Sequence, residues 1–229
     1  RHMHLYGTKR EHFAYVSVKA HRNAMLNPYA HYQVQLTLDE VLNSRMIADP
    51  LTLYMSNSSS DGASAVVVCS KKKARQYTTK PVFLTAWEGG TPPYVKGEAD
   101  LAEGPTELLS KKVYQTGGIG PEDVDVAQVH DAFSPGEIMQ IEELGFCAKG
   151  EGGPFVWQGN TEIGGKIPVN TDGGLEARGH PLGATGGAMV AELVCQLRGQ
   201  AGPRQVENAS VGLLQNAGFG GENIMLLKR

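Results

Sequence analysis

The sequence lacks any long apolar run, and this limits where the protein can act. No stretch approaches the roughly 18–20 apolar residues that cross a bilayer. The first residues, RHMHLYGTKREHF, are basic and polar, without the apolar centre of a secretory signal. The last residues, IMLLKR, differ from the Ser-Lys-Leu peroxisomal address. We therefore expect a cytoplasmic protein without a membrane span.

Cysteine is scarce, with Cys69, Cys147 and Cys195 as the three in the chain. An odd number without regular spacing does not fit a disulfide framework, and no Cys/His pair has zinc-ligand spacing, so we expect no metal site. A reactive cysteine needs a helix N-terminus or a nearby cation. Cys69 is predicted to end a buried strand and Cys195 to lie inside a helix. None of the three is therefore expected to be an activated nucleophile, and Cys147, in a glycine-rich loop, is the one remaining candidate.

A surplus of basic residues is also missing, because the net charge is −3. This disfavours a dedicated nucleic-acid-binding protein. Glycine, by contrast, is abundant at 29 residues, and many fall in the late segments GEGG, NTDGG through GATGG, and NAGFGG. Clustered glycines let loops approach a ligand closely, although tight turns between strands are the alternative explanation.

Strands and helices are predicted to alternate along the chain. Apolar spacing predicts a helix at 8–27 and a short helix at 38–44. The β-branched run 63–69 predicts a buried strand, and the basic segment 71–80 a solvated boundary between two units. Further predictions are strand 81–88, helix 101–116, strand 124–129, helix 135–144, a long glycine-rich loop 145–174, helix 181–197, and strands 210–215 and 223–227. This alternation is typical of an α/β layered fold.

The segment VHDAF stands where a predicted strand passes into a predicted helix. Ser134 is expected to be the N-cap of that helix, with Glu137 completing a capping box. Residues at the carboxyl ends of strands commonly line the ligand crevice of α/β sheets, so His130 is placed to donate a hydrogen bond or move a proton. Asp131 is expected to orient it or to help cap the helix. A lone histidine in such a place is more often structural.

The segment GHPLGATGG puts His180 directly before a helix that begins at a proline. A helix N-terminus offers free N–H groups and the positive end of the dipole, which suits a developing oxyanion and favours a neutral histidine. Gly183, Gly186 and Gly187 allow close packing of the helix. Helix packing alone is the competing interpretation.

Two further segments carry weaker signals. QNAGFGG follows a predicted strand, and its glycines allow close backbone approach to a ligand, but a turn between two strands is the default. SNSSSDGASA contains serines that could hydrogen-bond a polar ligand, and a solvated loop is the alternative.

Several segments, in this order, resemble the thiolase family, in the branch of sterol-carrier-type thiolases and related acetyl-CoA acetyltransferases. They are RMIADPLTLY, SDGASAVVV, VHDAFSPGE, GFCAKGEGG, PVNTDGG, GHPLGATG and NAGFGG, which together span nearly the whole chain. The resemblance implies a thiolase-like layered fold with a mixed β-sheet between helices. Residues 1–75 would be the end of the N-terminal half, including its loop region, and 76–229 the C-terminal domain.

In that family a cysteine of the first half takes the acyl group, and coenzyme A is part of the substrate rather than a bound cofactor. The resemblance gives His180 the role of activating that cysteine and His130 a place in an oxyanion hole. It further assigns substrate-pocket roles to Asn216, Gly218 and Gly220, and coenzyme A binding to Ser60, Gly183 and Ala184.

Both cysteine functions of the family lack a counterpart here. No segment matches the nucleophile region, which the family order places upstream of Arg1. Ala132 stands where the sterol-carrier-type branch carries an acid/base cysteine, and Gln215–Gly218 where other thiolases carry Cys-x-Gly. Forming or breaking a bond at the α-carbon needs a base for the proton and an oxyanion hole for the enolate. Losing a positioned acid/base lowers the rate roughly 10²- to 10⁴-fold, so His180 or a residue outside this chain would have to replace it.

Three interpretations follow. The first is a thiolase-like acyl-CoA C-acyltransferase, present as a truncated or split chain and completed by a homo-oligomer or by a chain or segment that supplies the nucleophilic cysteine. The second is a retro-aldol lyase acting on a β-hydroxyacyl-CoA with a small OB-fold partner, since that reaction needs no acyl-cysteine. The third is a non-catalytic subunit, which the two retained histidines disfavour.

Overall fold

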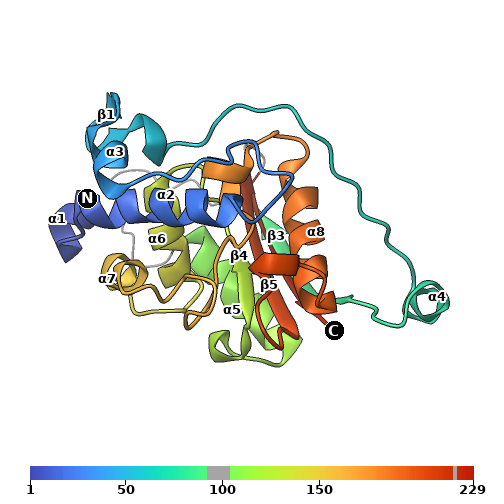
Figure 1. Cartoon of the computed structure of the whole chain (residues 1–229). Coiled ribbons are helices and arrows are strands. Elements are labelled where there is room, and N and C mark those ends of the chain that lie inside the picture. Colours follow the sequence, from blue (N-terminus) through green and yellow to red (C-terminus); the bar gives the residue numbers. More distant parts are fainter. Residues whose placement is uncertain (92–103, 219–220) are drawn as a thin grey trace.

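A mixed four-stranded sheet forms the centre of the computed structural model, which describes residues 1–91, 104–218 and 221–229. The strand order is β3-β6-β5-β4. The pairs β3–β6 and β5–β6 are antiparallel and β4–β5 is parallel. Their bounds are β3 Phe83–Gly90, β4 Val126–Gln128, β5 Val211–Gly218 and β6 Gly221–Lys228. The predicted α/β fold with a mixed sheet between helices is confirmed (Figure 1).

Helices pack on both faces of this sheet. Successive side chains of a strand point to opposite faces. Leu213 and Leu226 accordingly belong to the larger core with Val113 of α5 (Pro105–Gly117), whereas Leu214 belongs to a second core with Leu193 of α8 (Thr185–Arg198). The near-continuous apolar runs of β5 and β6 follow from this burial on both faces. Within the described residues, no helix combines the length and apolarity needed to cross a membrane.

The N-terminal helix α2 (Arg10–Ala24) falls inside the predicted range 8–27. Its predicted apolar positions are all buried, at Phe13, Val16, Ala20 and Ala24. This face packs against α6 (Ser134–Glu143) and α7 (Gly152–Trp157), the latter lying within the predicted loop 145–174. The shorter elements nearby are α1 His2–Tyr6, α3 Leu38–Asn43, β1 Met46–Ala48, β2 Leu51–Thr52 and a 3₁₀ turn at Leu53–Met55. The structure thus confirms the helix predicted at 38–44.

The buried strand predicted at 63–69 is wrong. This segment forms no strand, and Val67 and Val68 are 94% and 86% exposed. It runs as an extended arm to the exposed helix α4 (Lys71–Tyr77), well away from the sheet in Figure 1. β-branched residues favour an extended backbone, but a strand also needs a neighbour to pair with, and none of the described residues supplies one. The division of the chain near residue 75 stays a prediction.

Two predicted helix starts also need correction. Ser134 does not cap α6: Phe133 is the N-cap residue, and the Ser134 hydroxyl hydrogen-bonds to buried side chains. Helix α8 begins at Thr185 rather than at 181, because residues 181–184 form a turn in which the N–H groups of Ala184 and Thr185 donate to the Pro181 carbonyl. Helix α8 ends at Arg198, one residue beyond the predicted 197, and Gly199 follows it with a left-handed φ of 70°. For the helix predicted at 101–116, the first three residues lie outside the described part, and α5 covers the rest.

Candidate active site

His130 and His180 come together although they lie far apart in the sequence. Their ring centroids are 5.1 Å apart and the rings meet edge to face at 85°. His130 follows the carboxyl end of β4, as predicted. His180 follows a π-helical turn, Gly174–Arg178, that leads the chain back toward the same end of the sheet.

The surroundings of His130 come mainly from the end of β5. The amide oxygen of Asn216 lies 2.8 Å from its Nδ1, and its backbone N–H donates to the side-chain oxygen of Gln215 at 3.0 Å. Burial lowers the pKa of His130, although the Asn216 hydrogen bond and the Glu222 charge oppose this. The predicted pocket residue Asn216 thus contacts the histidine directly. Asp131 does not orient it, because its carboxyl accepts the N–H of Leu175 instead.

His180 is held by the first residue of α8. The hydroxyl of Thr185 lies 2.8 Å from Nδ1 of His180, whose exposed fraction is 8%. Burial lowers the pKa of His180, with smaller contributions from His130 and the Arg178 charge. The shift has the predicted direction, toward a neutral ring, but burial is its main cause, since the helix begins only at Thr185.

A hollow of about 370 Å³, lined by Pro181 directly after His180 but by neither histidine, brings together the residues expected to bind coenzyme A. Ser60, Gly183 and Ala184 all line it. The hydroxyl of Ser64 donates to the Ala184 carbonyl at 2.7 Å and holds the two walls together. The hydroxyl of Ser60 is buried and has no hydrogen-bond partner among the described residues.

One of the predicted pocket residues, Gly218, is not brought into this arrangement. Gly218 ends β5 in an exposed position, where it pairs with Gly221. Gly220 lies outside the described residues. Sequence reasoning also missed Gln215 as the anchor of the His130 backbone and Thr185 as the partner of His180, because neither residue has a pattern of its own.

The cysteines give no thiol at this site. All three, each within the described residues, are free. Burial and the charges of Glu142 and Glu151 raise the pKa of Cys147 to about 12, which is the opposite of activation, so the one remaining candidate among the cysteines has no support. Cys69 is exposed on the arm rather than buried. No cluster of His, Cys, Asp and Glu suited to a metal ion occurs in the described part of the chain.

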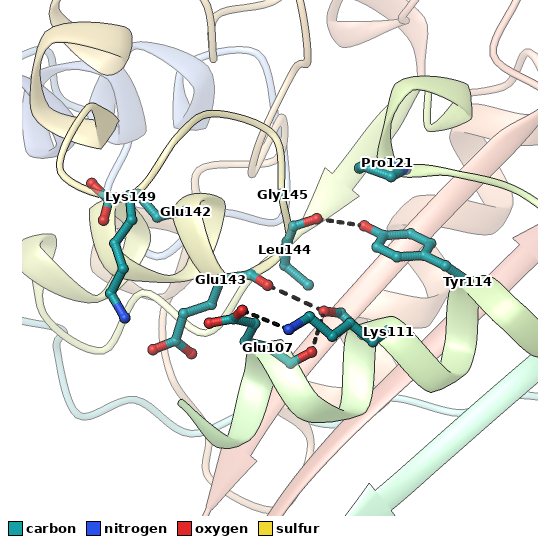
Figure 2. A pocket seen from close by; sticks show the side chains of 10 residues that line it. Glu107, Lys111, Tyr114, Pro121, Glu142, Glu143, Leu144, Gly145 and Lys149 are labelled. Atoms are coloured by element: carbon teal, nitrogen blue, oxygen red, sulfur yellow. Dashed lines mark hydrogen bonds and ion pairs between the residues drawn. The ribbon is translucent and has the colours of Figure 1, made fainter. Parts of the chain in front are cut away.

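A second hollow, of about 350 Å³, lies between α5 and the end of α6 (Figure 2). The Tyr114 hydroxyl donates to the Leu144 carbonyl at 2.8 Å, and Lys111 lies 2.8 Å from Glu107. Burial and the Glu222 charge raise the pKa of Glu143 to about 7. None of its lining residues adjoins His130 or His180 in the sequence, whereas Pro181 lines the first hollow, and the interactions drawn in Figure 2 join the lining residues to one another. We therefore do not place chemistry there.

Comparison with known proteins gives consistent matches. Residues 91–227 match the family described as Thiolase C-terminal domain-like. The acetyl-CoA acetyltransferase of Methanothermobacter thermautotrophicus is 46% identical over 220 residues, 95% of this chain and 57% of that protein. Sterol carrier protein 2 of Rattus norvegicus is 43% identical over 235 residues, 100% of this chain and 43% of that protein.

A solved structure gives the same result for the fold. The Ltp2-ChsH2(DUF35) aldolase superposes with a TM-score of 0.89 at 30% identity, over 100% of this chain and 60% of that chain. This chain spans about half the length of the curated relatives that it matches. Since the family match covers more than half of the residues and the fold agrees, the chain belongs to the thiolase family.

Proposed function

We propose that this chain supplies the acid/base part of an enzyme that forms or breaks a carbon–carbon bond beside an acyl-CoA thioester, with acyl transfer as its reaction. The observation that carries this proposal is the contact of His130 with His180, at 5.1 Å, beside the hollow lined by Ser60 and Gly183. Both rings have lowered pKa values and are therefore neutral at physiological pH, as a base or a neutral donor must be.

The partners of the two rings fix which nitrogen carries the hydrogen. The amide oxygen of Asn216 can only accept, so neutral His130 donates from Nδ1 and its Nε2 is an acceptor. The Thr185 hydroxyl donates to the Pro181 carbonyl and accepts from Nδ1 of His180, which leaves Nε2 of that ring an acceptor as well. Nε2 of His180 can therefore accept a proton from a thiol or from the α-carbon, and Nε2 of His130 can donate to the oxygen of an enolate once it has taken up a proton.

The thioester would approach these rings from the hollow. The buried hydroxyl of Ser60 offers a donor, and the glycine at 183 leaves its wall open, since no heavy atom lies within 4 Å of a Cβ built there. The nucleophilic cysteine would come from a segment or chain outside these residues, in a homo-oligomer or a hetero-complex. No metal or covalently bound cofactor enters this scheme.

Retro-aldol cleavage of a β-hydroxyacyl-CoA is a second candidate, favoured by Ala132. This residue follows the histidine-bearing strand end and brings no acid/base thiol, which cleavage without acyl transfer does not need. The 30% identical relative of the same fold is named as an aldolase with a DUF35 component. Under this candidate, the chain would act with a small partner of the OB-fold type.

The complete protein should be incubated with acetoacetyl-CoA plus coenzyme A, and separately with β-hydroxyacyl-CoA esters, with products followed by mass spectrometry. Two acetyl-CoA molecules from the first mixture support acyl transfer. A carbonyl compound plus a shortened acyl-CoA from the second supports the lyase. His180→Ala should abolish either activity, while His4→Ala, an exposed histidine on α1, serves as the matched control. Full activity of a folded His180→Ala variant, or no turnover of any ester, would reject the proposed function.

A further inference from the structure

Three carboxyl groups that the proposed reaction does not use are buried behind the histidine pair. They belong to Asp131, Glu137 and Glu176, whose exposed fractions are 0%, 0% and 2%. Lys19 of α2 is equally buried and forms an ion pair with Glu137 of α6. Among the described residues, the other two carboxyl groups have no ion-pair partner.

Asp131 and Glu176 instead form hydrogen bonds across the site. Oδ1 of Asp131 accepts the N–H of Leu175 at 2.8 Å, and Oε1 of Glu176 accepts the Ser134 hydroxyl at 2.8 Å. One residue of each bond belongs to the segment that follows His130, and the other belongs to the turn that leads to the second histidine. The two bonds therefore join the segments that carry the two rings.

The second oxygen of each carboxyl, Oδ2 of Asp131 and Oε2 of Glu176, is shielded from solvent without a hydrogen-bond partner among the described residues. An ionised carboxylate there would lose its hydration without compensation. Burial, aided by the Glu137 charge, raises the pKa of Asp131 to about 7. Burial and the Asp131 charge raise the pKa of Glu176 well above its usual range. Arg178, ion-paired with Asp172, opposes the shift at Asp131.

We propose that Asp131 and Glu176 are positioning residues: as neutral carboxyl groups they clamp the turn before His180 against the strand end of His130, and ionisation of Asp131 disturbs this clamp through repulsion from Glu137. The Leu175 hydrogen bond itself favours the ionised form and opposes this disturbance. A new charge on Asp131 would face the Glu137 carboxylate, whose Lys19 partner is already engaged. Neither clamp residue touches substrate, so both act through the placement of the rings. The consequence for turnover rests on the proposed function, whereas the neutral clamp itself does not.

Asp131→Asn tests the clamp, because asparagine is neutral at every pH and keeps an acceptor for the Leu175 N–H. In the complete wild-type protein, kcat should fall as the pH rises above about 7. In Asp131→Asn this fall should be absent. Asp131→Ala removes the acceptor and should lower kcat about 10- to 100-fold just below neutral pH, because small displacements of catalytic groups are this costly. KM for the ester should change less than about twofold, as for an effect on chemistry rather than on binding.

Infrared difference spectra give a readout without substrate, and remain decisive if Asp131→Ala fails to fold. The carbonyl stretch of a neutral carboxylic acid should be present in the wild type below neutral pH and lose the Asp131 contribution as the pH rises, and Asp131→Asn should lack that contribution at every pH. The ring-nitrogen NMR shifts of His130 and His180 should move in the same pH range in the wild type alone. Absence of the neutral-acid band, or identical pH behaviour of wild type and Asp131→Asn, would reject the clamp. If the neutral-acid band and the histidine NMR shifts behave as expected but the complete protein turns over none of the esters, the proposed function is rejected and the clamp is retained.

Discussion

Gly179 and Ser60 lie so close that a side chain at position 179 would collide with the serine. A Cβ on Gly179 would stand 2.7 Å from the Ser60 hydroxyl oxygen, and the φ of Gly179 is +112°, which L residues rarely adopt. This approach seats the residue before His180 against the wall of the hollow, so that the two expected functions, ester binding and proton transfer, meet at one point.

We expect Gly179→Ala to lower the free energy of unfolding by about 1–3 kcal/mol and to reduce turnover, because it adds both a collision and backbone strain. Urea unfolding followed by circular dichroism measures the first effect. Gly164→Ala is the matched control, since Gly164 also has a positive φ, +86°, but nothing lies within 4 Å of its Cβ position. Equal losses in the two variants would show that strain alone, and not the Ser60 contact, sets the effect.

The lowered pKa values of the two histidines predict how kcat/KM depends on pH at the acid end of the range. Burial lowers the pKa of both His130 and His180, so each ring stays neutral to a lower pH than a free imidazole. On the acid side, kcat/KM should therefore decline only below the pH range in which a free imidazole titrates, whereas the fall above neutral pH belongs to Asp131. A pH series with acetoacetyl-CoA measures this. An acid-side decline centred above the usual histidine range would contradict neutral, buried rings.

Ala132→Cys should raise acetoacetyl-CoA thiolysis by about tenfold or more, provided that the nucleophilic cysteine is supplied. The new thiol would stand two residues after His130 and could protonate or deprotonate the α-carbon. Release of acetyl-CoA measures the gain, and Ala132→Ser controls for size without an acidic thiol. An unchanged rate, together with retro-aldol activity, would favour the lyase.

The buried ion pair of Lys19 and Glu137 predicts a large effect on stability. Lys19→Met leaves a carboxylate buried without its partner and should cost about 3–5 kcal/mol, whereas the double variant Lys19→Met/Glu137→Leu should recover most of this. The exposed Glu107–Lys111 pair is the control, and Lys111→Met should change stability by less than about 1 kcal/mol. Denaturant unfolding of the wild type and of these three variants gives the free energies to compare. A small loss for Lys19→Met would mean that Glu137 is already neutral.

The raised pKa of Asp131 predicts that the free energy of unfolding falls as the pH rises. Its pKa of about 7 in the folded chain exceeds the usual 3.8, so between these values the unfolded chain has lost a proton that the native chain keeps. The contribution of this proton to the free energy of unfolding is fully present below about pH 4 and is lost as the pH rises to 7. The free energy of unfolding falls by at most about 1.4 kcal/mol for each pH unit in this window. The difference in unfolding free energy between wild type and Asp131→Asn should therefore decline across this window. A difference that stays flat would mean that native Asp131 is ionised.

The parts of the fold that follow a local period were predictable from the sequence. Helix α2 buries Phe13, Val16, Ala20 and Ala24 because an apolar stripe at helical spacing needs only one surface to pack against. The strands β5 and β6 were found for a similar reason. The arm at 63–69 was not, because its residues specify an extended backbone but not the neighbour that would turn it into a strand.

The two histidines of the candidate site could be picked out from their motifs, but the contact between them could not be predicted. His130 and His180 stand in motifs that point to chemistry, yet their contact depends on the turn at Gly174–Arg178, which has no sequence period. Ser134 has the pattern of a helix cap, but its hydroxyl bonds to Ser17 and Glu176. A capping pattern considers only neighbours along the chain, whereas these partners are distant.

The exposed arm also has a calorimetric consequence. Val66, Val67 and Val68 present apolar side chains to water at 44%, 94% and 86% exposure. A partner surface that covered them would remove that area from water, and burial of apolar area lowers the heat capacity. Association through the arm should therefore be marked by a binding enthalpy that becomes more negative on warming, even where the enthalpy at a single temperature is close to zero.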